Sequence, residues 1–185
     1  MRRTIVSGIV CCALLAWASP LQAQATLIIL ARHAEKSAPT GDPGLTPAGE
    51  ARAADLARAL AAVRLTGIVA TQYQRTQLTA APTAKASQLT PVIVSTSGGV
   101  QEHAAAVAKV IDALPPGSAV LVVGHSNTLG PILAALGGPA IPELCDNEFS
   151  TLLTLYRPGG GRAQLLRTRF GAAEPSDAAI CEAKM

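Results

Sequence analysis

The chain has 185 residues, of which 49% are hydrophobic and 3% aromatic, and its formal net charge is +3. This length and apolar content suffice for one domain whose core is built from Ala, Leu, Val and Ile. The charges form no basic run or stripe, which argues against nucleic acid as a partner.

The first 25 residues have the pattern of a secretory signal peptide. Arg2 and Arg3 precede the apolar stretch Ile5 to Trp17, which is short for a bilayer span, and Ala23-Gln24-Ala25 supplies a small-x-small cleavage pattern. An uncleaved anchor is the alternative. We expect cleavage after Ala23 or Ala25, export to the periplasm or the medium, no stable membrane anchor and one domain over residues 26–185. That domain would carry 13 basic and 12 acidic residues.

The first elements after this leader are a strand and a helix. The apolar run 27–31 predicts the strand, and residues 38–44 form a loop rich in Pro and Gly. Thr46 is suited to an N-cap and Pro47 to the first helical position. Leu56, Leu60 and Val63 then form the apolar face of an Ala-rich helix that we expect to end near 66–67.

The rest of the chain alternates strands and helices and closes with a hairpin. Strands are expected at 68–70, 92–94 and 119–123, and the helices that follow them at 76–87, 100–114 and 127–136. Segments 151–156 and 163–169, joined by Pro158-Gly159-Gly160-Gly161, have the pattern of a hairpin. This order predicts a single three-layer α/β domain, with a largely parallel sheet, helices on both faces and a C-terminal hairpin.

Basic side chains follow three of these strands directly. Arg32 and His33 end the first strand, Arg75 follows the strand at 68–70, and His125 follows the strand at 119–123. The carboxyl ends of parallel strands share one rim of a sheet, where α/β folds bind ligands. Guanidinium groups suit phosphate oxygens, and a neutral histidine can accept a phosphoryl group. The pattern therefore predicts a phosphoryl-binding pocket.

The same residues resemble the histidine phosphatase (phosphoglycerate-mutase-like) superfamily. Four ordered motifs between about 27 and 169 carry the resemblance, with Ala34 in place of the usual Gly: Arg32-His33-Ala34, Leu45-Thr46-Pro47-Ala48-Gly49, Arg75-Thr76-Gln77-Leu78-Thr79-Ala80 and Gly124-His125-Ser126-Asn127. The resemblance implies a metal-independent phosphatase with no cofactor, in which His33 is the nucleophile. It further implies that Arg32, Arg75 and His125 bind the phosphoryl group of a phosphorylated small molecule or a phosphoprotein.

The general acid is not assigned by the motifs. The family often has an Asn shortly after the first histidine, which is absent here, and acid phosphatases of the group follow the second histidine with Asp. Glu102 lies where many members have their acid, at a helix start that also favours a solvated carboxylate. Glu35, which adjoins the site, and the more distant Glu148 are further candidates. Asn127 is a possible additional site residue.

Four other interpretations remain to be weighed. A serine hydrolase elbow at Ser126 lacks the second Gly and has no histidine after it. A metal site from His33, His103 and His125 is disfavoured by the paired arginines. A phosphomutase would need long insertions that this chain lacks, and a non-catalytic binder of phosphorylated ligands stays open. The oligomeric state and the physiological substrate are not predicted.

Two cysteines lie outside the predicted leader, Cys145 and Cys181. Export to an oxidising compartment favours a disulfide between them, whereas two unpaired thiols are the alternative. A disulfide would hold the tail from Gly171 to Met185 beside the loop around Cys145.

Overall fold

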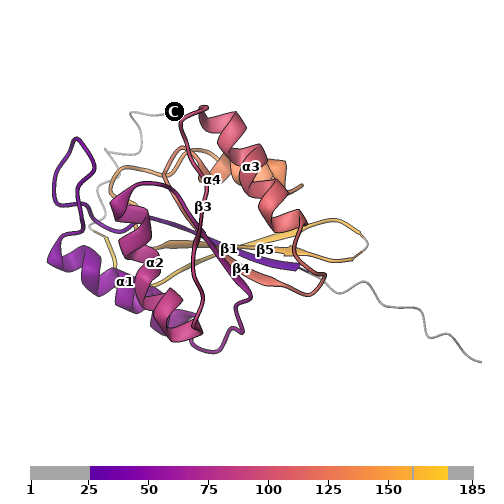
Figure 1. Cartoon of the computed structure of the whole chain (residues 1–185), viewed down its shortest axis with the longest axis horizontal. Coiled ribbons are helices and arrows are strands. Elements are labelled where there is room, and N and C mark those ends of the chain that lie inside the picture. Colours follow the sequence, from indigo (N-terminus) through magenta and orange to yellow (C-terminus); the bar gives the residue numbers. More distant parts are fainter. Residues whose placement is uncertain (1–25, 160, 175–185) are drawn as a thin grey trace, which may run out of the picture.

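The computed structural model describes residues 26–159 and 161–174, which form an α/β domain around a six-stranded mixed sheet (Figure 1). In chain order its elements are β1 (Thr26–Arg32), α1 (Pro47–Ala59), β2 (Gly67–Ala70), α2 (Gln74–Ser87), β3 (Val92–Ile93), α3 (Val100–Asp112), β4 (Ala119–Gly124), α4 (Leu129–Ala135), β5 (Thr151–Arg157) and β6 (Gln164–Arg169). No helix within these residues has the length and apolar content needed to cross a membrane. The single α/β domain expected from the sequence is confirmed.

The strand order is β3-β2-β4-β1-β5-β6, and the first four strands run parallel. β5 and β6 are antiparallel and form the predicted hairpin on the far side of β1. Each parallel strand is followed by a helix, so the loops after β1, β2, β3 and β4 meet at one rim of the sheet. This is the rim to which the sequence assigned the basic side chains.

Helices cover both faces of the sheet, as predicted. α1 and α2 pack together on one face, over a cluster that includes Ile29, Leu56 and Leu121. α3 and α4 pack together on the other, over a cluster that includes Val107, Val120 and Leu133. Figure 1 shows the two helix pairs on opposite sides of the strands. All of β4 is buried, because it lies in the middle of the sheet between both layers.

Helix boundaries differ from the sequence prediction by several residues. α1 begins as expected, since the Thr46 hydroxyl accepts a hydrogen bond from the Gly49 amide at 3.0 Å, but it ends at Ala59 instead of near 66. The chain turns at Leu60 to Val63, and this turn allows Leu65 to enter the core. α2 begins two residues earlier than expected, because Asp42 accepts the Gln74 amide proton at 2.8 Å.

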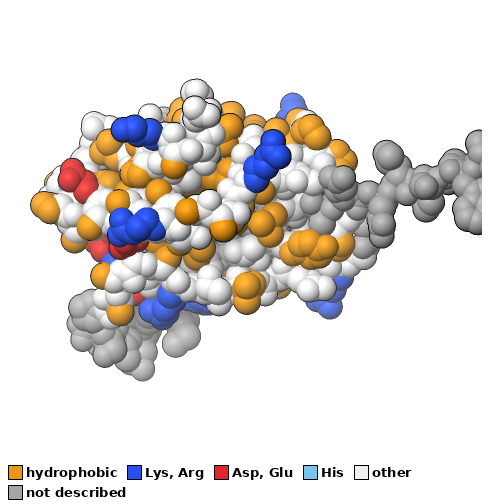
Figure 2. Space-filling view, turned by 90° about the horizontal axis from the view of Figure 1, so that it is seen from below, with side chains coloured by type: hydrophobic (Ala, Val, Ile, Leu, Met, Phe, Trp, Pro, Cys, Tyr) orange, Lys and Arg blue, Asp and Glu red, His pale blue; other side chains and the backbone are white. Residues whose placement is uncertain are grey.

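The surface agrees with the weak charge pattern of the sequence. On the face shown in Figure 2, Lys and Arg side chains lie apart from one another, in one place beside Asp or Glu, and form no continuous stripe.

Candidate active site

His33 and His125 are neighbours because of the register between β1 and β4. Arg32 pairs with Gly124 at the ends of the two parallel strands, and the His33 amide donates to the Gly124 carbonyl at 2.9 Å. The two histidines therefore occupy equivalent positions one residue beyond the paired ends. Their rings meet edge to face, with centroids 5.4 Å apart.

The His33 ring is held as one tautomer. Its Nδ1 lies 2.8 Å from the carbonyl oxygen of Ala34, which can only accept, so Nδ1 carries the proton and Nε2 has the lone pair. Burial lowers the pKa of His33 to about 4, and the charges of Arg32, Arg75 and Lys36 act in the same direction. His33 is therefore neutral at pH 7, with an imidazole nitrogen available for nucleophilic attack.

Arg32 is buried beneath the loop that follows α4. Its Nη1 donates to the carbonyl oxygens of Cys145 at 2.6 Å and Asp146 at 3.0 Å, and its guanidinium carbon lies 4.4 Å from the centre of the Phe149 ring. Burial lowers the pKa of Arg32, although nearby carboxylates, first among them Asp146, oppose this shift. The loop fixes the guanidinium through backbone carbonyls, and no carboxylate hydrogen-bonds to it in the described residues.

Arg75 reaches the same rim from the first turn of α2. Its guanidinium carbon lies 4.2 Å from the centre of the Tyr73 ring, and its Nη1 is 3.8 Å from a carboxylate oxygen of Asp42. Arg75 also contributes to lowering the pKa of both His33 and His125. The structure thus brings the four basic residues together, as the sequence predicted.

Both arginines retain an unused hydrogen-bond donor. Among the described residues, the Nε atoms of Arg32 and Arg75 are buried and have no hydrogen-bond partner. An unsatisfied buried donor of a charged group is costly, by about 1–3 kcal/mol or more. An oxyanion bound at this rim would satisfy such donors, so the donor set fits a phosphoryl group.

His125 is anchored from the opposite side by β2. Its Nε2 lies 3.2 Å from the Thr71 hydroxyl, and the Tyr73 ring packs edge to face against it at 5.4 Å. Burial lowers the pKa of His125 to about 3, and the neighbouring His33 and Arg75 add to the shift. His125 is therefore also neutral at pH 7.

The comparisons with known proteins agree with this geometry. The model of the histidine phosphatase superfamily (branch 1) matches residues 28–97, which include Arg32, His33 and Arg75. This part of the chain is therefore similar to the histidine phosphatase superfamily. His125 lies beyond the matched residues, and the pairing of β1 with β4 brings it to the same rim. A comparison with curated proteins gave no match.

Solved structures of several phosphatases have a similar fold. The protein histidine phosphatase SixA in complex with tungstate is 17% identical with a TM-score of 0.62, and the match covers 77% of this chain and 96% of that one. The putative phosphohistidine phosphatase SixA of Agrobacterium tumefaciens is 22% identical with a TM-score of 0.59, covering 80% and 99%. A mycobacterial glucosyl-3-phosphoglycerate phosphatase is 15% identical with a TM-score of 0.57, covering 79% and 99%. At these identities the likeness concerns the fold.

The candidate acids lie in different surroundings. Both oxygens of Glu35 are engaged by Arg52. Burial raises the pKa of Glu148, but hydrogen bonds from Thr151 and Arg167 outweigh this effect and lower it below its ordinary value, so this carboxylate is ionised at neutral pH.

The other two candidates from the sequence are more accessible. Glu102 is exposed in the first turn of α3, where its carboxylate lies over Gly98. Asn127 is exposed in the turn before α4. Of the acid candidates, Glu102 is therefore the one whose carboxylate is open to solvent at a helix start beside the rim.

Several residues that support the site were given no role in the sequence analysis, although two of them, Gly49 and Thr79, stand in its motifs. The Thr79 hydroxyl accepts the Ala34 amide proton at 2.9 Å and donates to the Arg75 carbonyl at 2.7 Å, so it joins the two arginine segments. Gly49 allows α1 to approach the backbone of Glu35 so closely that a Cβ atom would clash with its carbonyl oxygen. Thr71 directly follows β2 at the rim, and the rule that selected the histidines could have found it.

A short segment after β6 supports the loop that fixes Arg32. Glu174 accepts the amide proton of Phe149 at 2.8 Å and the hydroxyl proton of Ser150 at 2.6 Å. Cys145 lies in this loop, whereas Cys181 lies outside the described residues, so their pairing stays a prediction. The predicted signal peptide at 1–25 also lies outside the described residues, so it stays a prediction.

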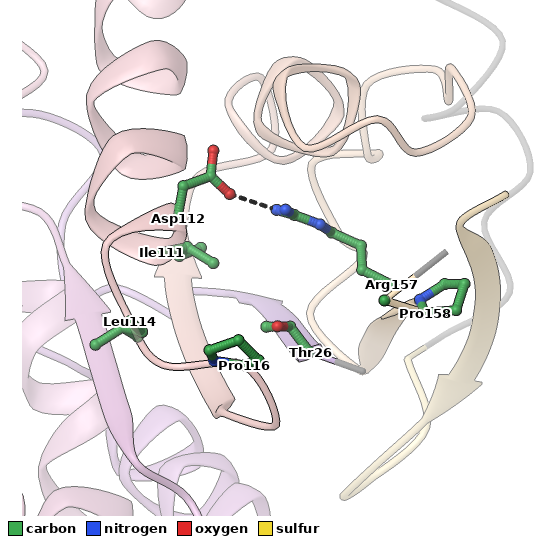
Figure 3. A pocket seen from close by; sticks show the side chains of 8 residues that line it. Thr26, Ile111, Asp112, Leu114, Pro116, Arg157 and Pro158 are labelled. Atoms are coloured by element: carbon green, nitrogen blue, oxygen red, sulfur yellow. Dashed lines mark hydrogen bonds and ion pairs between the residues drawn. The ribbon is translucent and has the colours of Figure 1, made fainter. Parts of the chain in front are cut away.

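A pocket of about 450 Å³ that is lined in part by Glu35, Arg52 and Phe149 adjoins the same loops, and two other features of the described chain are weaker candidates for a site. No group of three or more His, Cys, Asp or Glu side chains in residues 26–159 and 161–174 is arranged to hold a metal ion. A pocket of about 390 Å³ lies near Thr26, where β1 starts, at the opposite end of the sheet (Figure 3). Its two charged side chains, Asp112 and Arg157, pair with each other at 2.7 Å. The catalytic candidate is therefore the rim with the histidines.

Proposed function

We propose that this protein is a phosphatase that transfers a phosphoryl group to His33 and then to water. The observation that carries the proposal is the state of the His33 ring: neutral, with Nδ1–H bonded to the Ala34 carbonyl and the Nε2 lone pair available beside Arg32 and Arg75. The unpartnered Nε donors of the two arginines support binding of the phosphoryl oxygens. The match of residues 28–97 to the histidine phosphatase family model supports the same reaction class.

The reaction would proceed in two displacements. In the first, Nε2 of His33 attacks phosphorus, the bond from phosphorus to the leaving group breaks, and the leaving group takes up a proton. In the second, water attacks phosphorus and gives up a proton, and the P–Nε2 bond breaks, which returns neutral His33 and inorganic phosphate. Arg32 and Arg75 would stabilise the charge on the phosphoryl oxygens in both steps.

The proposed substrate is a phosphate monoester or another phosphoryl compound, on a small molecule or a protein. The protein histidine phosphatase SixA and the glucosyl-3-phosphoglycerate phosphatase among the similar structures act on such compounds by name. The chemistry needs no metal and no cofactor, because the arginines supply the positive charge. Glu102 is the proposed general acid for leaving groups that need a proton.

A second candidate function is the binding of phosphorylated ligands without turnover. It is favoured by the state of two acid candidates, since Glu35 is ion-paired with Arg52 and Glu148 with Arg167. A site without an acid would bind a monoester but release a poor leaving group slowly.

The test is an assay with an aryl phosphate in the presence of a metal chelator. We expect turnover by the wild type, none by His33→Ala, and near-normal turnover by Ser126→Ala, which removes the hydroxyl of the rival serine nucleophile. A rapidly quenched reaction should contain one acid-labile phosphoryl group per chain. Phosphate binding without turnover on any ester would favour the binding function, and loss of activity on chelation would contradict the metal-independent mechanism.

We further propose that the protein is exported by means of residues 1–25. Fractionation of cells expressing the full chain should place a shortened protein in the periplasm or the medium. A full-length protein in the cytoplasm or the membrane would contradict the proposal.

A further inference from the structure

The hydroxyl groups of Thr71 and Thr76 form a directed chain that ends on His125. The Thr76 hydroxyl lies 2.8 Å from the Tyr73 carbonyl and 3.2 Å from the Thr71 carbonyl. Both carbonyls can only accept, so we assign the Thr76 proton to the nearer one. The Thr76 oxygen lies 2.9 Å from the Thr71 hydroxyl and must accept from it, because its own proton is used. Each threonine has a single hydroxyl proton, and this series of hydrogen bonds assigns an acceptor to both protons.

The Thr71 oxygen can then only accept from His125. It lies 3.2 Å from Nε2 of His125 and also accepts the Tyr73 amide proton at 3.4 Å. The Thr71 proton points to Thr76. The hydrogen between Thr71 and His125 must therefore be carried by Nε2 of the His125 ring. Both threonines are buried, so water does not compete for these groups.

We infer that Thr71 is a positioning residue that fixes His125 as the Nε2–H tautomer, opposite to the Nδ1–H tautomer of His33. His125 then has its lone pair on Nδ1, whereas the lone pair of His33 is on Nε2. The depressed pKa of each ring is consistent with this assignment, since a tautomer is defined only for a neutral ring.

A consequence follows for phosphate binding, and it rests on the proposed function. A lone pair on Nδ1 would repel a phosphoryl oxygen, so binding of a phosphate dianion should add one proton at His125. Five charged or titratable groups face this ring: Arg32 at the end of β1, His33 directly after it, Tyr73 before α2, Arg75 in its first turn and His103 on α3. The cationic and imidazole groups disfavour an additional positive charge on His125. The negative charge of the bound phosphate would offset this effect.

The tautomers can be read directly by NMR, because the chain has only three histidines. His103 donates through Nδ1 to the Ser95 carbonyl at 3.0 Å, so long-range ¹H–¹⁵N spectra of ¹⁵N-histidine-labelled protein should show two Nδ1–H rings and one Nε2–H ring. The Nε2–H pattern should vanish in His125→Gln. An Nδ1–H pattern for His125 in the wild type would overturn the inference, whatever the activity.

Variants of the hydroxyl chain separate positioning from folding. Thr71→Val should give His125 a mixed tautomer, and Thr71→Ser should restore the Nε2–H pattern. Thr83→Val is the matched control, since Thr83 is also buried on this side of the sheet but its hydroxyl has no partner among the described residues. We expect it to leave all three rings unchanged. A folded Thr71→Val protein with an unchanged His125 pattern would contradict the role of Thr71.

Kinetics and phosphate titration complete the test. Thr71→Val should lower kcat/KM about 10- to 100-fold, which is the effect of removing the hydrogen-bond partner that orients a metal-bound histidine. Thr71→Ser should recover most of the lost kcat/KM. Saturating inorganic phosphate should convert His125 to the doubly protonated form, with about one proton taken up per phosphate in calorimetry at pH 8. An Nε2–H ring that phosphate leaves unchanged would support the tautomer and contradict the proposed phosphate site.

Discussion

The guanidinium of Arg52 binds the carboxylate of Glu35 through three hydrogen bonds of 2.8–3.0 Å. Glu35 lies two residues after His33 in the sequence. The same guanidinium donates to the carbonyl oxygens of Phe170 at 3.4 Å and Ala172 at 2.9 Å. Arg52 therefore joins the loop after β1, helix α1 and the segment after β6. The pair of Arg52 and Glu35 therefore stabilises the loop that follows His33.

Arg52→Met should destabilise the protein. The change leaves Glu35 and two carbonyl groups without their partner. We expect a loss of about 2–3 kcal/mol in the free energy of unfolding. This is less than for a fully buried ion pair, because water can reach part of Glu35. Arg58→Met is the matched control on α1: its ion pair with Asp55 is exposed and should contribute less than about 1 kcal/mol. Urea unfolding of both variants measures the difference, and equal losses would show that the buried pair contributes nothing special.

Arg75→Lys should reduce catalysis with little effect on stability. Lysine keeps the charge but lacks the planar fork. In the fold, Arg75 makes a long contact with Asp42, at 3.8 Å, and lies over the Tyr73 ring, and a lysine can retain part of both contacts. We expect kcat/KM to fall about 100-fold, as for removal of one donor to a developing oxyanion. The melting temperature should stay near that of the exposed control Arg64→Lys. A clear drop in melting temperature would instead make Arg75 a structural residue.

The buried histidines should make stability depend on pH. The pKa of His33 is lowered in the folded protein to about 4. As the pH falls below the ordinary pKa of histidine, the unfolded chain therefore takes up a proton at this position before the folded protein does. The contribution of the neutral ring is thus fully present above about pH 6.5 and is lost as the pH falls towards 4.

Comparison with His33→Gln isolates this effect. Between pH 7 and 5, the wild type should lose about 1–2 kcal/mol more than the variant in the free energy of unfolding. Denaturant unfolding at each pH, in buffers without phosphate, measures the difference. Parallel curves for the two proteins would mean that His33 titrates normally.

Glu102→Gln tests the proposed acid. The rate on an alkyl phosphate should fall about 10²-fold or more, whereas nitrophenyl phosphate, whose leaving group needs no proton, should be hydrolysed almost normally. Glu50→Gln is a suitable control, because Glu50 is also an exposed first-turn carboxylate, on α1. If both esters react normally with Glu102→Gln, Glu102 is only a helix-start carboxylate.

Thiol titration tests the predicted disulfide. Mature protein that is unfolded without reduction should contain no free thiol, since Cys145 and Cys181 are the only cysteines after residue 25. The bridge should contribute about 4 kcal/mol by restricting the unfolded chain. Two free thiols per chain would refute it.

The sequence by itself determined the fold class and the four basic residues of the site. Strands of apolar residues recur before helices, and the rule that parallel strands end at one rim placed Arg32, His33, Arg75 and His125 together without knowledge of the strand order. The hairpin and the N-cap at Thr46 also followed from local signals. These features depend on neighbouring residues or on a general rule of topology.

Only the tertiary structure decided which partners hold these side chains. The carbonyl that binds Arg32 comes from Cys145, the partner of Glu35 is Arg52, and the hydroxyl that orients His125 belongs to Thr71. These contacts join segments 17 to 113 residues apart. From the sequence alone, several other polar side chains were equally plausible hydrogen-bond partners. The selection depends on the packing of loops and helices against the sheet, which no local pattern encodes.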